Sequence, residues 1–128
     1  MFVDDNLPIF EQREPYIFKI DENSPSGIVI GKLNAIDLDE ITKPIYYYIV
    51  DGNSKREFFI EKMTGMIYTN ASFDHEQQNS YELVVKASNE ADLIFRQRDS
   101  FNRLTIKDRS FQKDDKSLAF VKVRFILN

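Results

Sequence analysis

Alternation of apolar and polar residues runs through most of the chain and predicts short β-strands. Residues Tyr16–Ile20 place an aromatic or aliphatic side chain at every second position, which is typical of a strand with one buried face. The same alternation recurs in later segments, and no helical period is sustained elsewhere. The remaining predicted strands are Ile28–Ile36, Ile45–Val50, Phe58–Ile60, Met66–Tyr68, Tyr81–Ala87 and Ala119–Leu127.

Turn signals separate these strands. Asp51-Gly52 follows the third strand, and Thr64-Gly65 indicates a short hairpin between the fourth and the fifth. Gly31 lies inside the second strand, where it predicts either a bulge or a close approach of another segment. About seven short strands separated by turns predict an all-β protein, built as a seven-strand antiparallel sandwich.

The composition narrows the classes of function. The 128 residues suit one compact domain, and 42% hydrophobic residues can form a core. The net charge of −4 argues against a nucleic-acid partner, and no apolar run reaches the roughly 20 residues that span a bilayer. With 0 Cys and 1 His, the chain has no disulfides or thiolate metal sites, and most catalytic triads are excluded.

A long connection at residues 92–117 interrupts the regular spacing of the strands. It carries five acidic and seven basic residues, so its charge is +2 within a chain of net charge −4. Connections of this length without structure are uncommon in compact domains. We therefore expect a hairpin, a helical turn or an extension of the flanking strands, and the sequence does not choose among them.

Acidic and amide side chains gather immediately before or after the predicted strands. A strand of roughly 10 residues spans about 33 Å, so carboxylates on either side of the second strand lie at opposite ends of the domain. Clustered carboxylates repel one another unless a cation lies among them, and Ca²⁺ prefers such hard oxygen ligands. One end collects Glu22, Asp74 and Glu76, and the other collects Asp5, Asn6, Asp37, Asp39 and Asn89.

Neither set forms a complete coordination shell, which predicts half-sites shared with neighbouring modules. The pair Asp74 and Glu76 could also serve as a general acid and base. Catalysis would need an enclosed pocket as well, and the sequence indicates none. We therefore predict that the protein is not an enzyme.

Seven motifs in register resemble a cadherin repeat along nearly the whole chain. Each is weak alone, and their order is what makes the resemblance specific. They are DDNLPIF (4–10), DENSPSG (21–27), AIDLD (35–39), FFIEKMTGMI (58–67), FDHE (73–76), YELVVKASNEA (81–91) and FILN (125–128).

The resemblance implies a Greek-key sandwich with Ca²⁺ bound at the junctions between repeats. It implies that Glu22, Asp74 and Glu76 bind Ca²⁺ with the next repeat, and that the other five residues do so with the previous one. Asn89 stands where the family usually has Asp, which removes a negative charge from its end. We expect a single repeat over residues 1–128, with a linker remnant at 1–7 and the insertion at about 92–117.

The resemblance also implies an extracellular, calcium-dependent cell-adhesion module of a plasma-membrane protein. Its partners would be the neighbouring repeats and a homophilic or heterophilic cadherin-type protein, with no nucleic acid and no small-molecule substrate. The alternative is a calcium-independent immunoglobulin-like module that binds a protein through residues 92–117. The triplet Asn70-Ala71-Ser72 fits the N-glycosylation pattern of a secreted glycoprotein.

Overall fold

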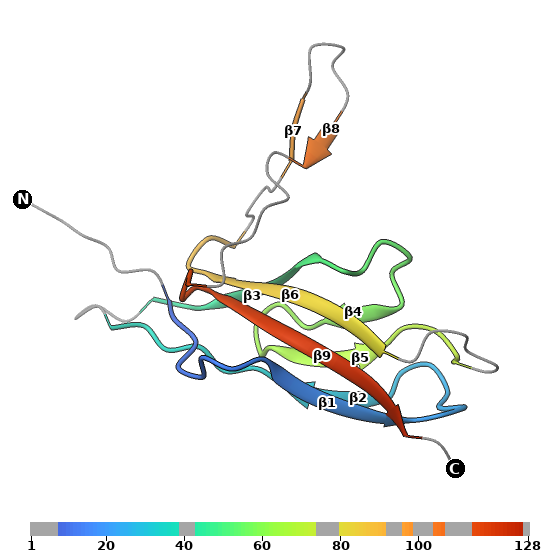
Figure 1. Ribbon diagram of the computed structural model, residues 1–128. Coiled ribbons are helices and arrows are strands. Elements are labelled where there is room, and N and C mark those ends of the chain that lie inside the picture. The colour runs from blue at the N-terminus through green and yellow to red at the C-terminus, as the bar shows by residue number, and fades with distance from the viewer. Residues whose placement is uncertain are drawn as a thin grey trace, which may run out of the picture.

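The computed structural model describes residues 8–38, 43–73, 80–91, 96–98, 104–106 and 114–126, and all of its regular elements are strands (Figure 1). Among these residues, no helix is long and apolar enough to cross a membrane. The strands are β1 (Tyr16–Asp21), β2 (Val29–Lys32), β3 (Tyr46–Asp51), β4 (Phe58–Ile60), β5 (Met66–Thr69), β6 (Ser80–Ser88), β7 (Arg96–Arg98), β8 (Leu104–Ile106) and β9 (Leu118–Ile126).

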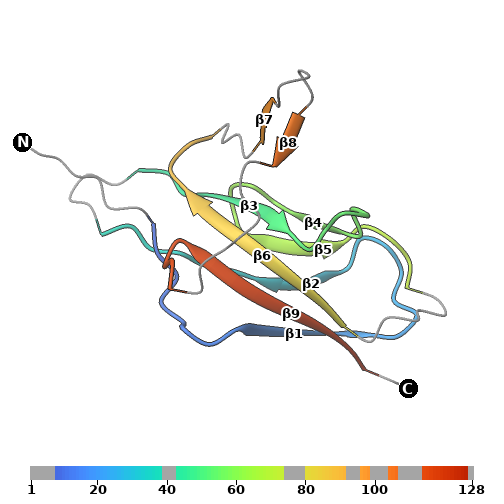
Figure 2. The same cartoon turned by 45° about the horizontal axis from the view of Figure 1, so that its top comes forward.

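Two sheets face each other to form the sandwich (Figures 1 and 2). The larger has the strand order β1-β9-β6-β3, and the smaller has the order β2-β5-β4. β1 pairs parallel with β9, whereas the other pairings between described strands are antiparallel. The predicted all-β sandwich is confirmed, with this one parallel pair as an exception. A parallel pair needs a long connection, and here the rest of the domain lies between the first strand and the last.

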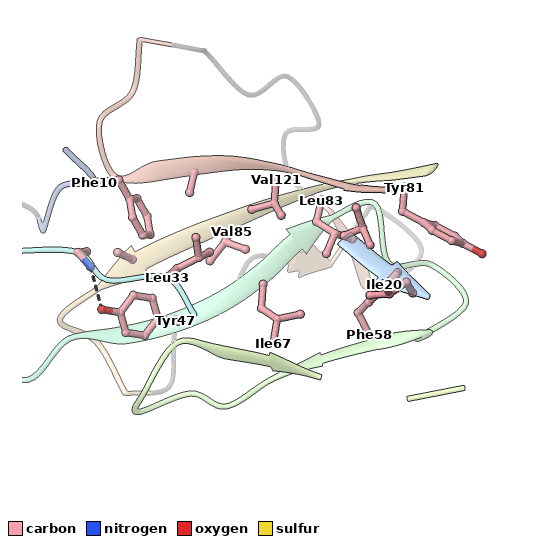
Figure 3. Close-up of a cluster of buried hydrophobic side chains, with 14 of the residues drawn as sticks. Phe10, Ile20, Leu33, Tyr47, Phe58, Ile67, Tyr81, Leu83, Val85 and Val121 are labelled. Carbon is pink, nitrogen blue, oxygen red and sulfur yellow. Dashed lines mark hydrogen bonds between the residues drawn. The ribbon is translucent and has the colours of Figure 1, made fainter. Parts of the chain in front are cut away.

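The core lies between the two sheets, and its residues follow the predicted alternation (Figure 3). On β6 the predicted face of Tyr81, Leu83, Val85 and Ala87 is buried, and on β9 the buried face includes Val121 and Val123, with Phe125 partly buried. Leu127, predicted on that face, lies outside the described residues. The other buried apolar residues of this cluster are Phe10, Ile20, Leu33, Ala35, Tyr47, Phe58, Ile67, Phe73 and Ala119.

Gly31 combines both roles that its place in a strand predicts. The register of β2 against β5 shifts between Val29 and Gly31, which is a bulge. A Cβ atom at Gly31 would lie 2.6 Å from the ring of Phe18, so the backbone approaches that ring closely. The predicted strand Ile28–Ile36 is shorter in the structure because the segment changes partners: β2 ends at Lys32, and Ile36 then bridges to Ile9.

The long connection contains a hairpin of its own, which is one of the three predicted alternatives. β7 and β8 pair antiparallel in a separate two-stranded sheet. The chain leading into this insertion is held against the sandwich, because the Tyr48 hydroxyl donates to the carbonyl of Glu90 and Lys62 Nζ donates to that of Ala91 at 2.9 Å. Where the chain returns, Ser117 is 2% exposed and its hydroxyl accepts a hydrogen bond from Lys86 Nζ.

Candidate metal sites at the two poles

The strand directions separate the three predicted ligands that the structure describes, Glu22, Asp37 and Asn89, into two groups. β6 runs antiparallel to β9, whereas β1 runs parallel to it. Asn89, which follows β6, therefore lies at the opposite end from Glu22, which follows β1 (Figure 1). We call the end with Asp37 and Asn89 the N-terminal pole, and the end with Glu22 and Ile126 the C-terminal pole. This agrees with the predicted separation of these residues along the domain.

At the N-terminal pole, two predicted ligands that lie far apart in the sequence are in contact. Asn89 Nδ2 donates a hydrogen bond to Asp37 Oδ2 at 3.0 Å and lies 2.9 Å from the carbonyl oxygen of Pro44. Asp37 and Asn89 both lie on loops, and both are only partly buried. The fold therefore brings one carboxylate and one amide together at a place that solvent reaches.

Tyr47 holds the segment that leads from β2 to Asp37. Its ring is buried in the core, and its hydroxyl accepts a hydrogen bond of 2.9 Å from the backbone N–H of Ala35 (Figure 3). Of the three consecutive tyrosines at 46–48, Tyr47 alone is buried. The sequence does not indicate the partner of its hydroxyl, because a hydrogen bond across 12 residues has no local sequence signal.

A backbone bridge brings the amino-terminal segment to the same pole. Ile9 and Ile36 exchange two hydrogen bonds, each of 2.8 Å. The bridge thus holds a residue that closely follows the predicted ligands Asp5 and Asn6 beside the residue that precedes Asp37. Asp5, Asn6 and Asp39 themselves lie outside the described residues.

At the C-terminal pole, backbone contacts join three segments. The N–H of Glu22 donates to the carbonyl of Ile126 at 3.0 Å, and the N–H of Asn23 lies 3.4 Å from the carbonyl oxygen of Phe73. Phe73 directly precedes the predicted ligands Asp74 and Glu76, which lie outside the described residues. The turn that carries Glu22 therefore contacts Phe73, the residue that directly precedes Asp74 in the sequence.

An aromatic cluster supports this pole from inside, and the sequence analysis did not single it out. Phe73 is fully buried, and its ring centroid lies 5.6 Å from that of Phe58, 5.9 Å from that of Tyr81 and 5.2 Å from that of Phe125. Four rings packed against one another leave little freedom for the backbone at Phe73. The only sequence signal for this cluster is the aromatic residue that opens the FDHE motif.

The donor atoms at both poles suit a hard cation. Carboxylates at Asp37 and Glu22 and the amide at Asn89 offer oxygen ligands, which Ca²⁺ prefers. Within the described ranges, no three His, Cys, Asp or Glu side chains gather closely enough to hold a metal ion. The half-sites stay a prediction, because five of the eight predicted ligands lie outside the described residues.

Comparison with known proteins identifies the family. The profile of the cadherin domain matches residues 16–107. The chain belongs to the cadherin family. The family match ends before β9, so the last strand of this cadherin domain is identified from its pairing with β1 and β6. Cadherins are adhesion proteins and not enzymes, and their domains generally bind calcium.

Relatives and solved structures agree with this assignment. The domain is 39% identical over 90 residues to Cadherin-87A of Drosophila melanogaster. The aligned residues make up 70% of this chain and 5% of the relative. It is 38% identical over 114 residues to the mouse (Mus musculus) Cadherin EGF LAG seven-pass G-type receptor 2, covering 88% and 4%. The crystal structure of chicken VE-cadherin EC1-2 matches with a TM-score of 0.63 and 26% identity, over 97% of this chain and 52% of that one.

The matched region is a small part of each relative. The chain spans about a twentieth of the length of the curated relatives. The homologues identify a module of a cell-adhesion ectodomain, and such ectodomains are extracellular parts of membrane proteins.

Proposed function

We propose that this cadherin domain is a calcium-dependent adhesion repeat in the extracellular part of a plasma-membrane protein. Ca²⁺ shared with the adjacent repeats would fix the angle between them, so that other repeats of the same protein can meet a homophilic or heterophilic cadherin-type partner. The observation that carries the proposal is the contact of Asp37 with Asn89 at one pole, with Glu22 at the other. Residues 1–7 would be the linker remnant and 92–117 the insertion.

The residues that would hold the ions divide by pole. Asp5, Asn6, Asp37, Asp39 and Asn89 would serve the junction with the previous repeat, and Glu22, Asp74 and Glu76 the junction with the next. Bound Ca²⁺ would offset the mutual repulsion of the carboxylates. Because the loops leave strands of the sandwich, a shared ion would couple two rigid bodies rather than two flexible segments.

Calcium should raise the melting temperature of the domain when it carries both neighbouring repeats. We expect millimolar Ca²⁺ to stabilise the folded state by binding it selectively, and we expect Asp37→Ala and Glu76→Ala each to remove part of that rise. Thermal melting in Ca²⁺ and in a chelator measures this. Glu82→Ala is the matched control, because this exposed carboxylate lies within β6, away from both poles.

An equal melting temperature in Ca²⁺ and in chelator would overturn the proposal. The calcium-independent binding module would then be favoured, with residues 92–117 as its binding segment. Hydrogen bonds that Tyr48 and Lys62 donate to the chain entering the insertion give that segment a defined base on the sandwich. A partner captured in chelator, and lost when the insertion is shortened to a tight turn, would support this second function.

Asn89→Asp should make the domain more dependent on calcium. Without Ca²⁺, a carboxylate at this position would face Asp37 Oδ2 and the carbonyl of Pro44, so two hydrogen bonds become repulsive contacts. We expect a loss of about 1–3 kcal/mol in chelator. With Ca²⁺ the added charge should tighten binding, by roughly tenfold for each 1.4 kcal/mol gained.

Calcium titration followed by calorimetry, with melting in chelator, measures both effects in the domain with its two neighbours. Asn89→Ala is the control, since it removes the same hydrogen bonds without adding charge and should lower stability without tightening binding. If Asn89→Asp leaves the calcium affinity unchanged, residue 89 does not contact the ion, and the proposed ligand set of the N-terminal pole is wrong at this position.

A further inference from the structure

The triplet Asn70-Ala71-Ser72 follows β5 on the surface of the smaller sheet. Asn70 and Ser72 are both exposed. The N–H of Asn70 donates to the carbonyl of Glu57 at 2.7 Å, which continues the pairing of β5 with β4 by one residue. Asn70 therefore keeps the side-chain alternation of the strand and falls on the same face as Tyr68, two residues before it.

That face carries apolar side chains directed away from the core. Tyr68 lies opposite Phe59 of β4 and Val29 of β2 in the strand register. Phe59 is 55% exposed and Val29 is 47% exposed, and the ring centroids of Phe59 and Tyr68 lie 6.2 Å apart. We call Val29, Tyr68 and Phe59 the outer apolar row. It crosses the sheet next to Asn70.

We propose that Asn70 carries an N-linked oligosaccharide whose first sugar residues pack on the rings of Tyr68 and Phe59. The row is exposed, and a sugar attached to Asn70, two residues from Tyr68 on the same strand face, is tethered beside it. One face of a pyranose ring presents C–H groups, which pack well on the electron-rich face of an aromatic ring. The inference rests on the proposed extracellular location, because the modification occurs on the secretory route.

The side-chain amide of Asn70 has one backbone partner, and the modification leaves it one N–H group. Asn70 Nδ2 donates to the carbonyl of Arg56 at 3.0 Å. In the transfer, this nitrogen forms a bond to C1 of an oligosaccharide carried by a polyprenyl pyrophosphate. The C1–O bond to phosphate breaks, the lipid pyrophosphate leaves with the bonding electrons, and the amide loses one proton to a base. The second N–H remains and can continue to donate to Arg56.

The domain with both neighbouring repeats, secreted from animal cells behind an added signal peptide, tests the attachment. Ser72→Ala removes the acceptor pattern and keeps Asn70. We expect peptide mass spectrometry to find the glycan at Asn70 in most wild-type chains and in none of the Ser72→Ala chains. An unoccupied Asn70 in the secreted wild-type protein would overturn the proposal.

Melting tests the packing of the sugar. We expect the glycosylated protein to melt about 3 °C above the Ser72→Ala protein, as one well-packed ring contact would give. In a Phe59→Thr background this difference should nearly vanish. An equal difference with and without Phe59 would refute the packing. Melting the same samples in Ca²⁺ and in chelator tests the adhesion proposal separately: lost calcium dependence with Asn70 occupied refutes only that function.

Discussion

Replacing Phe73 by Ala should lower the free energy of unfolding by about 3–5 kcal/mol, the range for truncating a buried phenylalanine. The ring is fully buried and contacts Phe58, Tyr81 and Phe125, which come from both sheets. Removing it would leave a cavity among three large rings that cannot collapse into it together. The same change should weaken calcium binding at the proposed C-terminal site, because the backbone of Phe73 contacts the turn that carries Glu22.

Urea denaturation of the unglycosylated domain measures the first effect, and calcium titration of the domain with its neighbours measures the second. Phe59→Ala is the matched control, because it removes the same side chain from a position that is 55% exposed, and it should cost far less. We expect the loss of unfolding free energy for Phe73→Leu to lie between those for Phe73→Ala and Phe59→Ala. Equal losses at the two phenylalanines would mean that the ring cluster does not support the fold.

Much of this fold could be predicted from the alternation of apolar residues along the strands. The buried faces of β1, β6 and β9 lie where the pattern put them, and the hairpin between β4 and β5 lies at Thr64-Gly65. These features depend on neighbours one or two residues away, so a single sequence carries their signal. The cadherin resemblance added the order of the strands, which periodicity alone does not provide.

Features that join distant segments could not be predicted in this way. The hydrogen bond between Asn89 and Asp37 spans 52 positions, and the parallel pairing of β1 with β9 joins the first strand of the sandwich to the last. The hairpin of β7 and β8 was one alternative among three, because mixed charges and scattered apolar residues suit several structures. The motif at Asp74 and Glu76 remains a prediction, since both lie outside the described residues.

Replacing Gly52 by Ala should cost roughly 3–5 kcal/mol, because strain and a backbone clash act together. Gly52 has φ of 86°, a conformation that residues with a Cβ rarely adopt. A Cβ atom there would lie 1.9 Å from the carbonyl oxygen of Glu82 on β6. The neighbour is backbone within a paired strand, so it cannot move aside as a flexible side chain would. We expect β3 to separate from β6 at this end.

Gly27 provides a control that separates the two causes. Its φ is 89°, close to that of Gly52, yet among the described residues no atom beyond its chain neighbours lies within 4 Å of the place where a Cβ would sit. Gly27→Ala should therefore carry the conformational strain alone, roughly 1–2 kcal/mol. Urea denaturation of both variants yields the difference, which we assign to the contact with Glu82. If the two substitutions cost the same, the end of β3 yields to the added methyl group, and the pairing of β3 with β6 there contributes little to stability.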